Sequence, residues 1–311
     1  MIRSRPENIV TLRELLPVAQ RHGFAVGSFS PRYPLMIPPI LRAAQRLESP
    51  LIVQISQKDM TRCGVEVAAF SRAFYRYLQE LEITVPVTLH LDHTEAFAVI
   101  EAAIQAGFSS VMIDASDKPL AENIAQTREV ANYAHARGVS VEGELGTIGA
   151  FGFSETEAKD EAAMTDPEQV ERFVSGAQVD ALAVSVGTVH GVRQGRTVVV
   201  DSERLGQIRA QTDVPLVLHG GSGIDAAVLV QAIRVPEGGV SKVNLATDLE
   251  LAMLRALGSE ARLVDTQIEA LSPEELARAQ AAVEQVVAQK ITKSLLSDGK
   301  ARHYAGSVAG R

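Results

Sequence analysis

The feature that most constrains the fold of this chain is a series of eight short, apolar, β-branched runs along most of its length. Each run has about the length of a buried parallel strand, and seven of the eight end in Gly, Ser or His, the last ending in Ala246. Their starts lie about 25–41 residues apart, which leaves room for one crossover helix and two loops. The runs are 24–30, 50–56, 85–93, 110–116, 140–146, 181–187, 215–221 and 240–246.

The segments between these runs are amphipathic and carry helix-start signals. These signals are Pro38 with Pro39, Thr94, and Thr165 or Asp166 before Pro167. Eight alternating units predict an α/β fold, a (β/α)8 TIM barrel. A doubly wound sheet would carry a Gly-rich fingerprint after its first strand, where this chain has Pro-Arg-Tyr-Pro at 31–34. We therefore expect a single domain over 1–311, with the barrel at about 20–260, a helical extension at about 261–300 and a tail at 301–311.

Composition excludes several classes of protein. The chain has 311 residues, with 30 Lys and Arg against 38 Asp and Glu, so its net charge is −8 and no basic excess favours nucleic acid. Cys63 is the single cysteine and can form neither an intramolecular disulfide nor a cysteine-rich zinc cluster. No apolar run approaches the ~18–20 residues of a membrane span. We expect a cytoplasmic protein with no membrane or nucleic-acid partner.

In a barrel, chemistry is carried at the C-terminal ends of the strands, hereafter the rim. Three of the seven histidines, His93, His190 and His219, follow the third, sixth and seventh runs. Three imidazoles around an open position suit Zn²⁺. A lone histidine at a strand end is more often an ordinary hydrogen-bonded residue, so the pattern leaves both interpretations open.

Two Gly-rich or polar turns favour an anion site. His219–Ile224 leads from a strand into a helix and offers backbone N–H groups, the Ser222 hydroxyl and a helix N-terminus. The next run ends in Asn244–Asp248, which adds further N–H donors and the Thr247 hydroxyl. Phosphate sites after strands 7 and 8 recur in barrels, although glycine also serves tight turns.

Glutamates occupy two further positions of interest. Glu142 and Glu144 share one face of the fifth run, and if that face points inward they need a metal, a lysine such as Lys242, or water. A solvated pair is the alternative. Residues 147–165 form a long segment without a clean pattern, which is typical of an active-site cover. Its glutamates, Glu155 and Glu157, could reach a closed site.

Five stretches together resemble the class II, zinc-dependent ketose-bisphosphate aldolases, with the closest likeness to the tagatose- and fructose-bisphosphate branch. They are HLDH at 90–93, the segment 111–149, GTVHG at 187–191, LHGGSGI at 218–224 and KVNLATD at 242–248. The resemblance extends from about residue 24 to residue 300, with the motifs in the family's order.

The resemblance implies reversible aldol cleavage of a ketose phosphate to a dihydroxyacetone-phosphate-like product and an aldehyde. It implies zinc, one ion per subunit, on His93, His190 and His219, with Glu144 at an alternative metal position. Asp92 would be the general acid/base. The resemblance implies that the phosphate is held by Gly191, Gly220, Gly221, Ser222, Asn244, Leu245, Ala246 and Thr247. We also assign Ser56, at the second strand end, to substrate binding.

Two departures from the family point to an unusual substrate. After the first strand the family has Phe-Asn followed by a further Asn and Glu, whereas this chain has Phe-Ser-Pro-Arg-Tyr-Pro-Leu at 29–35. Arg32 could read an extra anionic group there, or be a solvated loop residue. The family's paired acidic residues in the cover are replaced by Gly-Ala-Phe-Gly at 149–152. Glu155 or Glu157 could take over the proton transfer after a shift in the loop, or a different relay could operate; of these we assign the role to Glu155.

Other functions remain open at this point. A zinc hydrolase on the same barrel would usually carry a His-x-His pair after its first strand, and none occurs here. A relative that binds sugar phosphate without turnover is the third possibility. The family forms dimers or tetramers, so a homodimer or homotetramer is expected.

Overall fold

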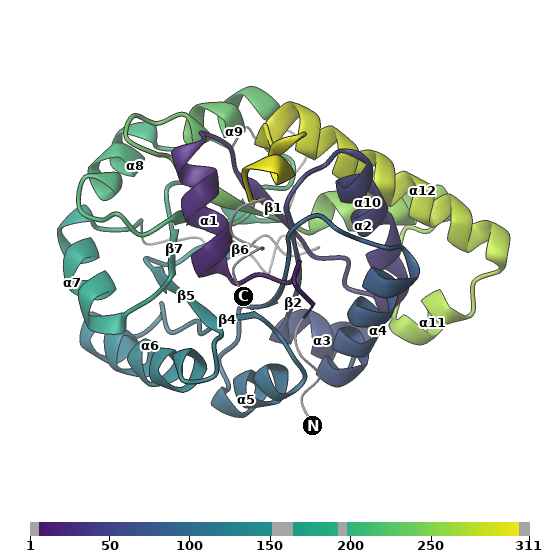
Figure 1. The fold of residues 1–311 in the computed structure, drawn as a ribbon, viewed down its shortest axis with the longest axis horizontal. Helices are drawn as coiled ribbons and strands as arrows, with labels where there is room; N and C mark the ends of the chain where they lie inside the picture. Colours follow the sequence, from purple (N-terminus) through teal and green to yellow (C-terminus); the bar gives the residue numbers. More distant parts are fainter. Residues whose placement is uncertain (1–5, 151–163, 192–197, 305–311) are drawn as a thin grey trace.

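Eight parallel strands close into a barrel (Figure 1). The computed structural model describes residues 6–150, 164–191 and 198–304. The order around the barrel is β1-β10-β9-β7-β5-β4-β3-β2, and β1 closes it against β10, with Val26 opposite Lys242. The barrel strands are β1 Val26–Phe29, β2 Leu51–Ser56, β3 Val87–Asp92, β4 Ser110–Met112, β5 Ser140–Leu145, β7 Ala181–Val184, β9 Leu216–Leu218 and β10 Val240–Leu245. Each lies within one of the eight runs, and the expected TIM barrel is confirmed.

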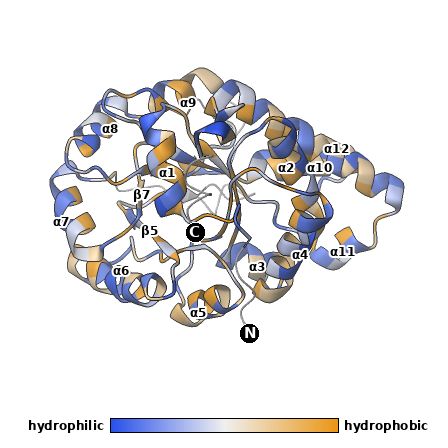
Figure 2. Cartoon of the chain, viewed as in Figure 1, coloured by the Kyte–Doolittle hydropathy of each residue, from blue (hydrophilic) through white to orange (hydrophobic). Residues whose placement is uncertain are grey.

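A ring of helices surrounds the strands and buries their outer face. Figure 2 shows apolar and polar residues mixed on these helices, as expected for elements with one face toward the core. The helices that follow or connect strands are α2 Ile37–Arg46, α3 Gln57–Cys63, α4 Val67–Glu80, α5 Phe97–Gln105, α6 Leu120–His135, α7 Pro167–Ala177, α8 Ser202–Arg209 and α9 Ala226–Ile233, with a 3-10 turn η1 at Pro34–Met36.

The helix-start signals are right at two places and wrong at one. Pro38 and Pro39 lie in the first turn of α2, and the Asp166 side chain caps α7 just before Pro167. Thr94 does not cap α5, whose N-cap is Ala96. The Thr94 hydroxyl instead donates back to the Asp92 carbonyl at 3.1 Å, and α5 begins two residues later than a cap at Thr94 would place it.

A helix that the sequence analysis did not assign, α1 at Leu12–Arg21, lies across the N-terminal opening of the barrel (Figure 1). Its apolar residues pack with inward-facing strand residues such as Val26, Ile52 and Val217 in a separate core cluster. The N–H of Leu12 donates to the Ser140 hydroxyl at 2.9 Å. Among the described residues, α1 thus fills the N-terminal end of the barrel, which leaves the rim as the expected side for a ligand.

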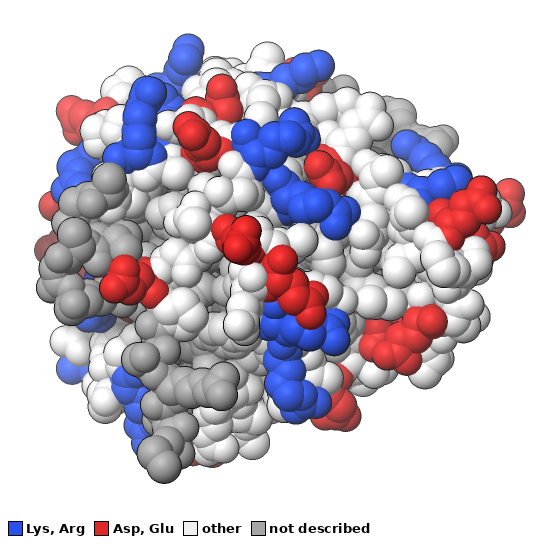
Figure 3. Space-filling model, turned by 45° about the vertical axis from the view of Figure 1, so that its right-hand side comes forward, with Lys and Arg blue, Asp and Glu red and all other residues white. Residues whose placement is uncertain are grey.

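After the last strand, α10 Thr247–Leu257 completes the eighth unit of the barrel. The C-terminal extension follows it and contains α11 Asp265–Glu269, α12 Pro273–Gln289, a π-helical segment η3 Lys290–Leu295 and a 3-10 turn η4 Lys300–Tyr304. Of these elements, α11 and α12 project to one side in Figure 1. α12 packs against α10 and α2, and η3, which follows it, contacts α9 and β1. Figure 3 shows acidic and basic side chains interspersed over one face. No helix in the described ranges is long and apolar enough to cross a membrane.

Candidate active site

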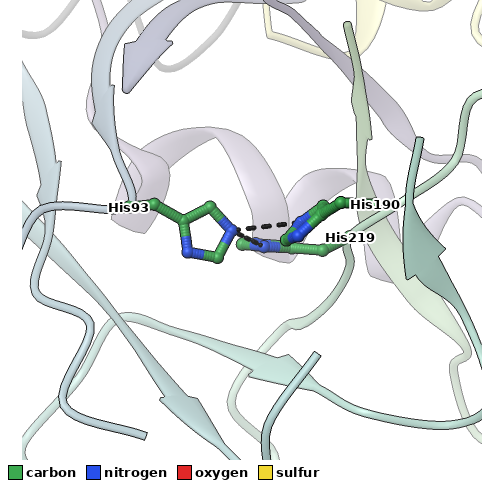
Figure 4. A group of neighbouring side chains, drawn as sticks. All are labelled: His93, His190 and His219. Carbon is green, nitrogen blue, oxygen red and sulfur yellow. Dashed lines mark hydrogen bonds between the residues drawn. The ribbon is translucent and has the colours of Figure 1, made fainter. Parts of the chain in front are cut away.

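Three histidines from separate elements converge at the rim (Figure 4). His93 follows β3, His219 follows β9, and His190 belongs to β8 (Val189–His190), a short strand paired with β6 (Gly149–Ala150) outside the barrel. The Nε2 atom of His93 lies 3.2 Å from His190 Nε2 and 2.7 Å from His219 Nδ1. The backbone of His93 has φ +24°, an uncommon value for a residue with a side chain and one that often marks functional positions.

Carboxylates decide which ring nitrogen of two histidines carries the proton. His93 Nδ1 lies 2.8 Å from Asp114 Oδ2, and His219 Nε2 lies 2.8 Å from Glu142 Oε1. A carboxylate only accepts hydrogen bonds, so both of these nitrogens are donors. His219 Nδ1 therefore presents a lone pair toward His93 Nε2 in a neutral ring, and either a proton on His93 Nε2 or a bound cation can satisfy it.

The electrostatics of the site also favour a cation. Burial lowers the pKa of His93, but the negative charges of Asp92, Glu144 and Asp114 outweigh burial and raise the pKa to about 10. Burial and the neighbouring His93 lower the pKa of His190 to about 3. The donor set is thus three nitrogens within 4.8 Å of one another, surrounded by negative charge. These residues fit a metal ion with an open coordination position.

Glu144 lies beside this group. Its Oε2 atom is 3.7 Å from His219 Nδ1 and 4.0 Å from His93 Nδ1, and this buried atom has no hydrogen-bond partner among the residues that the structure describes. Burial, with the repulsion of Asp114, raises the pKa of Glu144 to about 8. His93, Asp114 and Glu144 together form a second set of donors that could hold a metal.

Beneath the histidines the barrel interior is polar. Glu142 and Lys242 are fully buried, with Lys242 Nζ 2.8 Å from Glu142 Oε2. The inward orientation of the fifth strand is therefore as expected, and Lys242 is the partner of Glu142. His90 also faces the interior, where its Nδ1 atom lies 2.8 Å from the Ser110 hydroxyl. His90, Asp92 and Glu142 form a third set of possible metal donors, but Lys242 already neutralises Glu142.

Asp92, the last residue of β3, is clamped by two amides. Gln54 Nε2 donates to its Oδ2 at 3.0 Å, and Asn244 Nδ2 donates to its Oδ1 at 3.0 Å. The Ser28 hydroxyl donates to Gln54 Oε1 and fixes that amide in turn. Burial is the main cause that raises the pKa of Asp92. Asn244 Oδ1 is buried and lacks a partner within the described residues, so it is an acceptor open to a ligand.

The loops after β9 and β10 are tied to each other. The Ser222 hydroxyl accepts from the N–H groups of Ala246 and Asp248, both at 3.2 Å. The Gly221 N–H donates to the Asn244 carbonyl at 3.0 Å, and the Gly223 N–H donates to Asp248 Oδ1 at 3.1 Å. The expectation that this turn offers unhindered N–H groups is therefore wrong for Gly221 and Gly223, whose donors hold the two loops together.

This arrangement orients the Ser222 hydroxyl. Because its oxygen already accepts two N–H groups, its hydrogen is directed elsewhere and is available to an anion. Gly220, with φ +68°, lies so close to β8 that an added Cβ would stand 2.2 Å from the Val189 carbonyl oxygen. The glycine at this position thus allows the loop after β9 to approach β8, the strand that carries His190.

The remaining sequence-predicted residues are dispersed. Ser56 caps α3 by accepting from the Asp59 N–H at 3.0 Å. Arg32 is buried: its Nε atom is 3.2 Å from Asp59 Oδ1, and its Nη1 atom donates to Glu250. The alternative of a solvated Arg32 is therefore wrong. Gly191 follows His190 with φ +98°. Glu155 and Glu157 lie outside the described residues.

Two contributors to the site, Asp114 and Gln54, have no role among the residues predicted from the sequence. Both stand on strand ends, and Gln54 lies opposite His90 in the register of β2 and β3, which places it on the interior face. Alternation along the strand was a usable signal for Gln54. No local signal pairs Asp114 with His93, because 21 residues separate them.

Comparisons with known proteins agree on one family. A family model described as class-II fructose-bisphosphate aldolase matches residues 10–300. The fructose-bisphosphate aldolase of Geobacillus stearothermophilus is 38% identical over 250 residues, covering 80% of this chain and 85% of that protein. The 6-phospho-5-dehydro-2-deoxy-D-gluconate aldolase of Bacillus velezensis is 41% identical over 243 residues, covering 78% and 81%. The crystal structure of the YdjI aldolase from Escherichia coli K12 superposes with a TM-score of 0.78 at 29% identity, covering 94% and 99%.

Proposed function

The chain belongs to the class-II fructose-bisphosphate aldolase family, and from that premise we propose that it is a zinc-dependent aldolase acting on a ketose phosphate. Cleavage would yield a dihydroxyacetone-phosphate-like product and an aldehyde. The observation that carries this proposal is the convergence of His93 Nε2, His190 Nε2 and His219 Nδ1, which are oriented as metal donors by Asp114 and Glu142.

The metal supplies Lewis-acid polarisation of the substrate carbonyl when it is bound to the three nitrogens. Asp92 would take the proton of the C4 hydroxyl in cleavage and return it in synthesis. Gln54 and Asn244 hold the two oxygens of Asp92 in one orientation, so that its position does not depend on the substrate. The free Oδ1 of Asn244 would accept a substrate hydroxyl.

The tied loops after β9 and β10 would bind the phosphate group. We assign four kinds of contributor to phosphate binding. They are the Ser222 hydroxyl, the N–H groups of Ser222 and Thr247, Gly220 in the loop after β9, and Gly191 directly after β8. The first turn of α10 adds the positive end of a helix. Leu245 and Ala246 form the wall of this cradle. Glu155 keeps its proposed role in moving the C3 proton.

The substrate differs among the relatives, since two of them are named for different phosphorylated sugars or sugar acids. Arg32 is neutralised by Asp59 and Glu250, so its capacity to read a further anion is reduced. We propose a phosphorylated ketose whose far end differs from that of fructose bisphosphate. A zinc hydrolase is not favoured by any contact described above.

A retro-aldol assay over a panel of ketose mono- and bisphosphates and phosphorylated keto-sugar acids tests the proposal. Aldehyde release should appear with one panel member, disappear after chelation and return when Zn²⁺ is added back. Phosphate release without aldehyde would instead support a hydrolase. Tight substrate binding in calorimetry without turnover on any panel member would support a binding protein, and either outcome contradicts an aldolase.

A further inference from the structure

A partly buried ion pair joins the C-terminal extension to the loops of the phosphate cradle. Lys290 Nζ lies 2.7 Å from Asp248 Oδ2, and their side chains are 14% and 18% exposed. Asp248 stands in the first turn of α10. Lys290 is the residue at which the last helix changes from α geometry in α12 to π geometry in η3, and such changes often occur at functional positions.

The Asp248 carboxylate has a structural task that brings it close to the proposed phosphate. Its two oxygens accept from the Gly223 N–H at 3.1 and 3.2 Å, and its own N–H donates to the Ser222 hydroxyl. Asp248 therefore fixes both ends of the Ser222 turn. A carboxylate in this position also opposes an incoming phosphate dianion, because like charges repel strongly where solvent is partly excluded.

We propose that Lys290 is a positioning residue for phosphate binding that neutralises Asp248 and holds it against the Gly223 N–H. This inference rests on the proposed function, because it concerns the same cradle. The Asp248 carboxylate can then link the loops after β9 and β10 by its hydrogen bonds to Gly223. The positive charge of Lys290 offsets the repulsion between that carboxylate and an anionic ligand. Lys290 does so without itself contacting the reacting atoms.

The test separates charge neutralisation from simple scaffolding. In Lys290→Met the Asp248 charge is left uncompensated, so the KM for the phosphorylated substrate and the Kd for inorganic phosphate should both rise on the order of 10-fold, with kcat nearly unchanged. In Lys290→Met combined with Asp248→Asn the charge is absent, and an amide oxygen still accepts from Gly223. Affinity should then return to within a few-fold of the wild type.

Lys293→Met is the matched control, because Lys293 is an exposed lysine in the same η3 segment and its removal changes the net charge equally. It should leave KM and Kd unchanged. Lys290→Arg, which keeps the positive charge, should retain most of the phosphate affinity. Melting temperatures of all variants exclude loss of folding as the cause.

The outcomes distinguish the inference from the proposed function. If the wild type binds phosphate and Lys290→Met leaves Kd and KM unchanged, the inference is wrong and the aldolase proposal stands. If the double variant is as weak as or weaker than Lys290→Met, Lys290 acts by scaffolding, which also overturns neutralisation. If the wild-type protein binds neither inorganic phosphate nor any phosphorylated panel member, the proposed function itself fails.

Discussion

The ammonium group of Lys242 lies 2.8 Å from a carboxylate oxygen of Glu142 in the centre of the barrel, and neither side chain has any exposed surface. The other oxygen of Glu142 accepts from His219 Nε2. One ion pair in the core thus orients a histidine at the rim. Glu142 therefore takes part both in the buried ion pair of the barrel core and in the orientation of His219 at the proposed metal site.

Removal of Lys242 should be strongly destabilising. In Lys242→Met, Glu142 keeps a buried charge without its partner, and the free energy of unfolding should fall by about 3–5 kcal/mol. Urea unfolding measures the change. Adding Glu142→Gln, which retains an acceptor for His219 but removes the charge, should recover part of the loss. If the double variant is less stable than the single one, the destabilisation does not arise from an unpaired charge.

Asp114 should tune metal affinity through His93. In Asp114→Ala, His93 Nδ1 loses the carboxylate that orients the ring, and the metal dissociation constant should rise about 10–100-fold. Competition with a chromophoric chelator measures it. Asp117→Ala is the control, because Asp117 is exposed in the same loop and pairs only with Lys118 among the described side chains. Equal metal affinity in the two variants would refute the role of Asp114.

Asp92 should affect turnover and not metal content. Asp92→Ala should lower kcat by roughly 10²–10⁴-fold, the effect expected for a general acid/base, while bound zinc stays stoichiometric. His219→Ala should lose the metal instead. Steady-state kinetics and metal analysis of the same preparations give both quantities. Wild-type turnover in Asp92→Ala would exclude it as the proton-transfer group.

Two glycines with positive φ should respond differently to alanine. Gly220 and Gly64 have φ +68° and +75°, so each substitution should cost about 1–2 kcal/mol from backbone strain. Only at Gly220 would the new Cβ meet a neighbour, the Val189 carbonyl oxygen, whereas Gly64 has no atom within 4 Å of it. Gly220→Ala should therefore displace β8 with His190 and weaken metal binding, and Gly64→Ala should not. Chelator competition and thermal unfolding compare them.

Cys63 should be unreactive in the native protein near neutral pH. Burial, followed by the negative charge of Asp59, raises the pKa of its thiol to about 11. At pH 8 the thiolate fraction is then about 0.1%, against roughly a quarter for a thiol of ordinary pKa. Labelling with a disulfide reagent should be slow at pH 8, faster at pH 10 and rapid in urea. Fast stoichiometric labelling of the folded protein at pH 8 would contradict the burial of this residue.

Much of the barrel could be predicted from the sequence because its signals are local. Strand runs, the helix starts at Pro38 and Asp166, and the alternation that turns Glu142 and Asp92 inward each depend on a few neighbouring residues. A local signal can also mislead. Thr94 is a typical capping residue, but its hydroxyl bonds back to Asp92, and the N-cap of α5 is Ala96. The family resemblance inferred from the short motifs is confirmed by the match over residues 10–300.

The amino-acid sequence by itself determined the order of strands, the rim positions of His93, His190 and His219, and the glycine turns beside them. Only the tertiary structure decided the partners: Asp114 for His93, Glu250 for Arg32, and Lys290 for Asp248. The physical reason is that charge pairing depends on distance in space, and these partners are separated by 21 to 218 positions or lie on elements that meet only after the barrel has closed. A pattern can place a charged residue at the rim, but the packing around it decides whether that charge is open to a ligand or already neutralised.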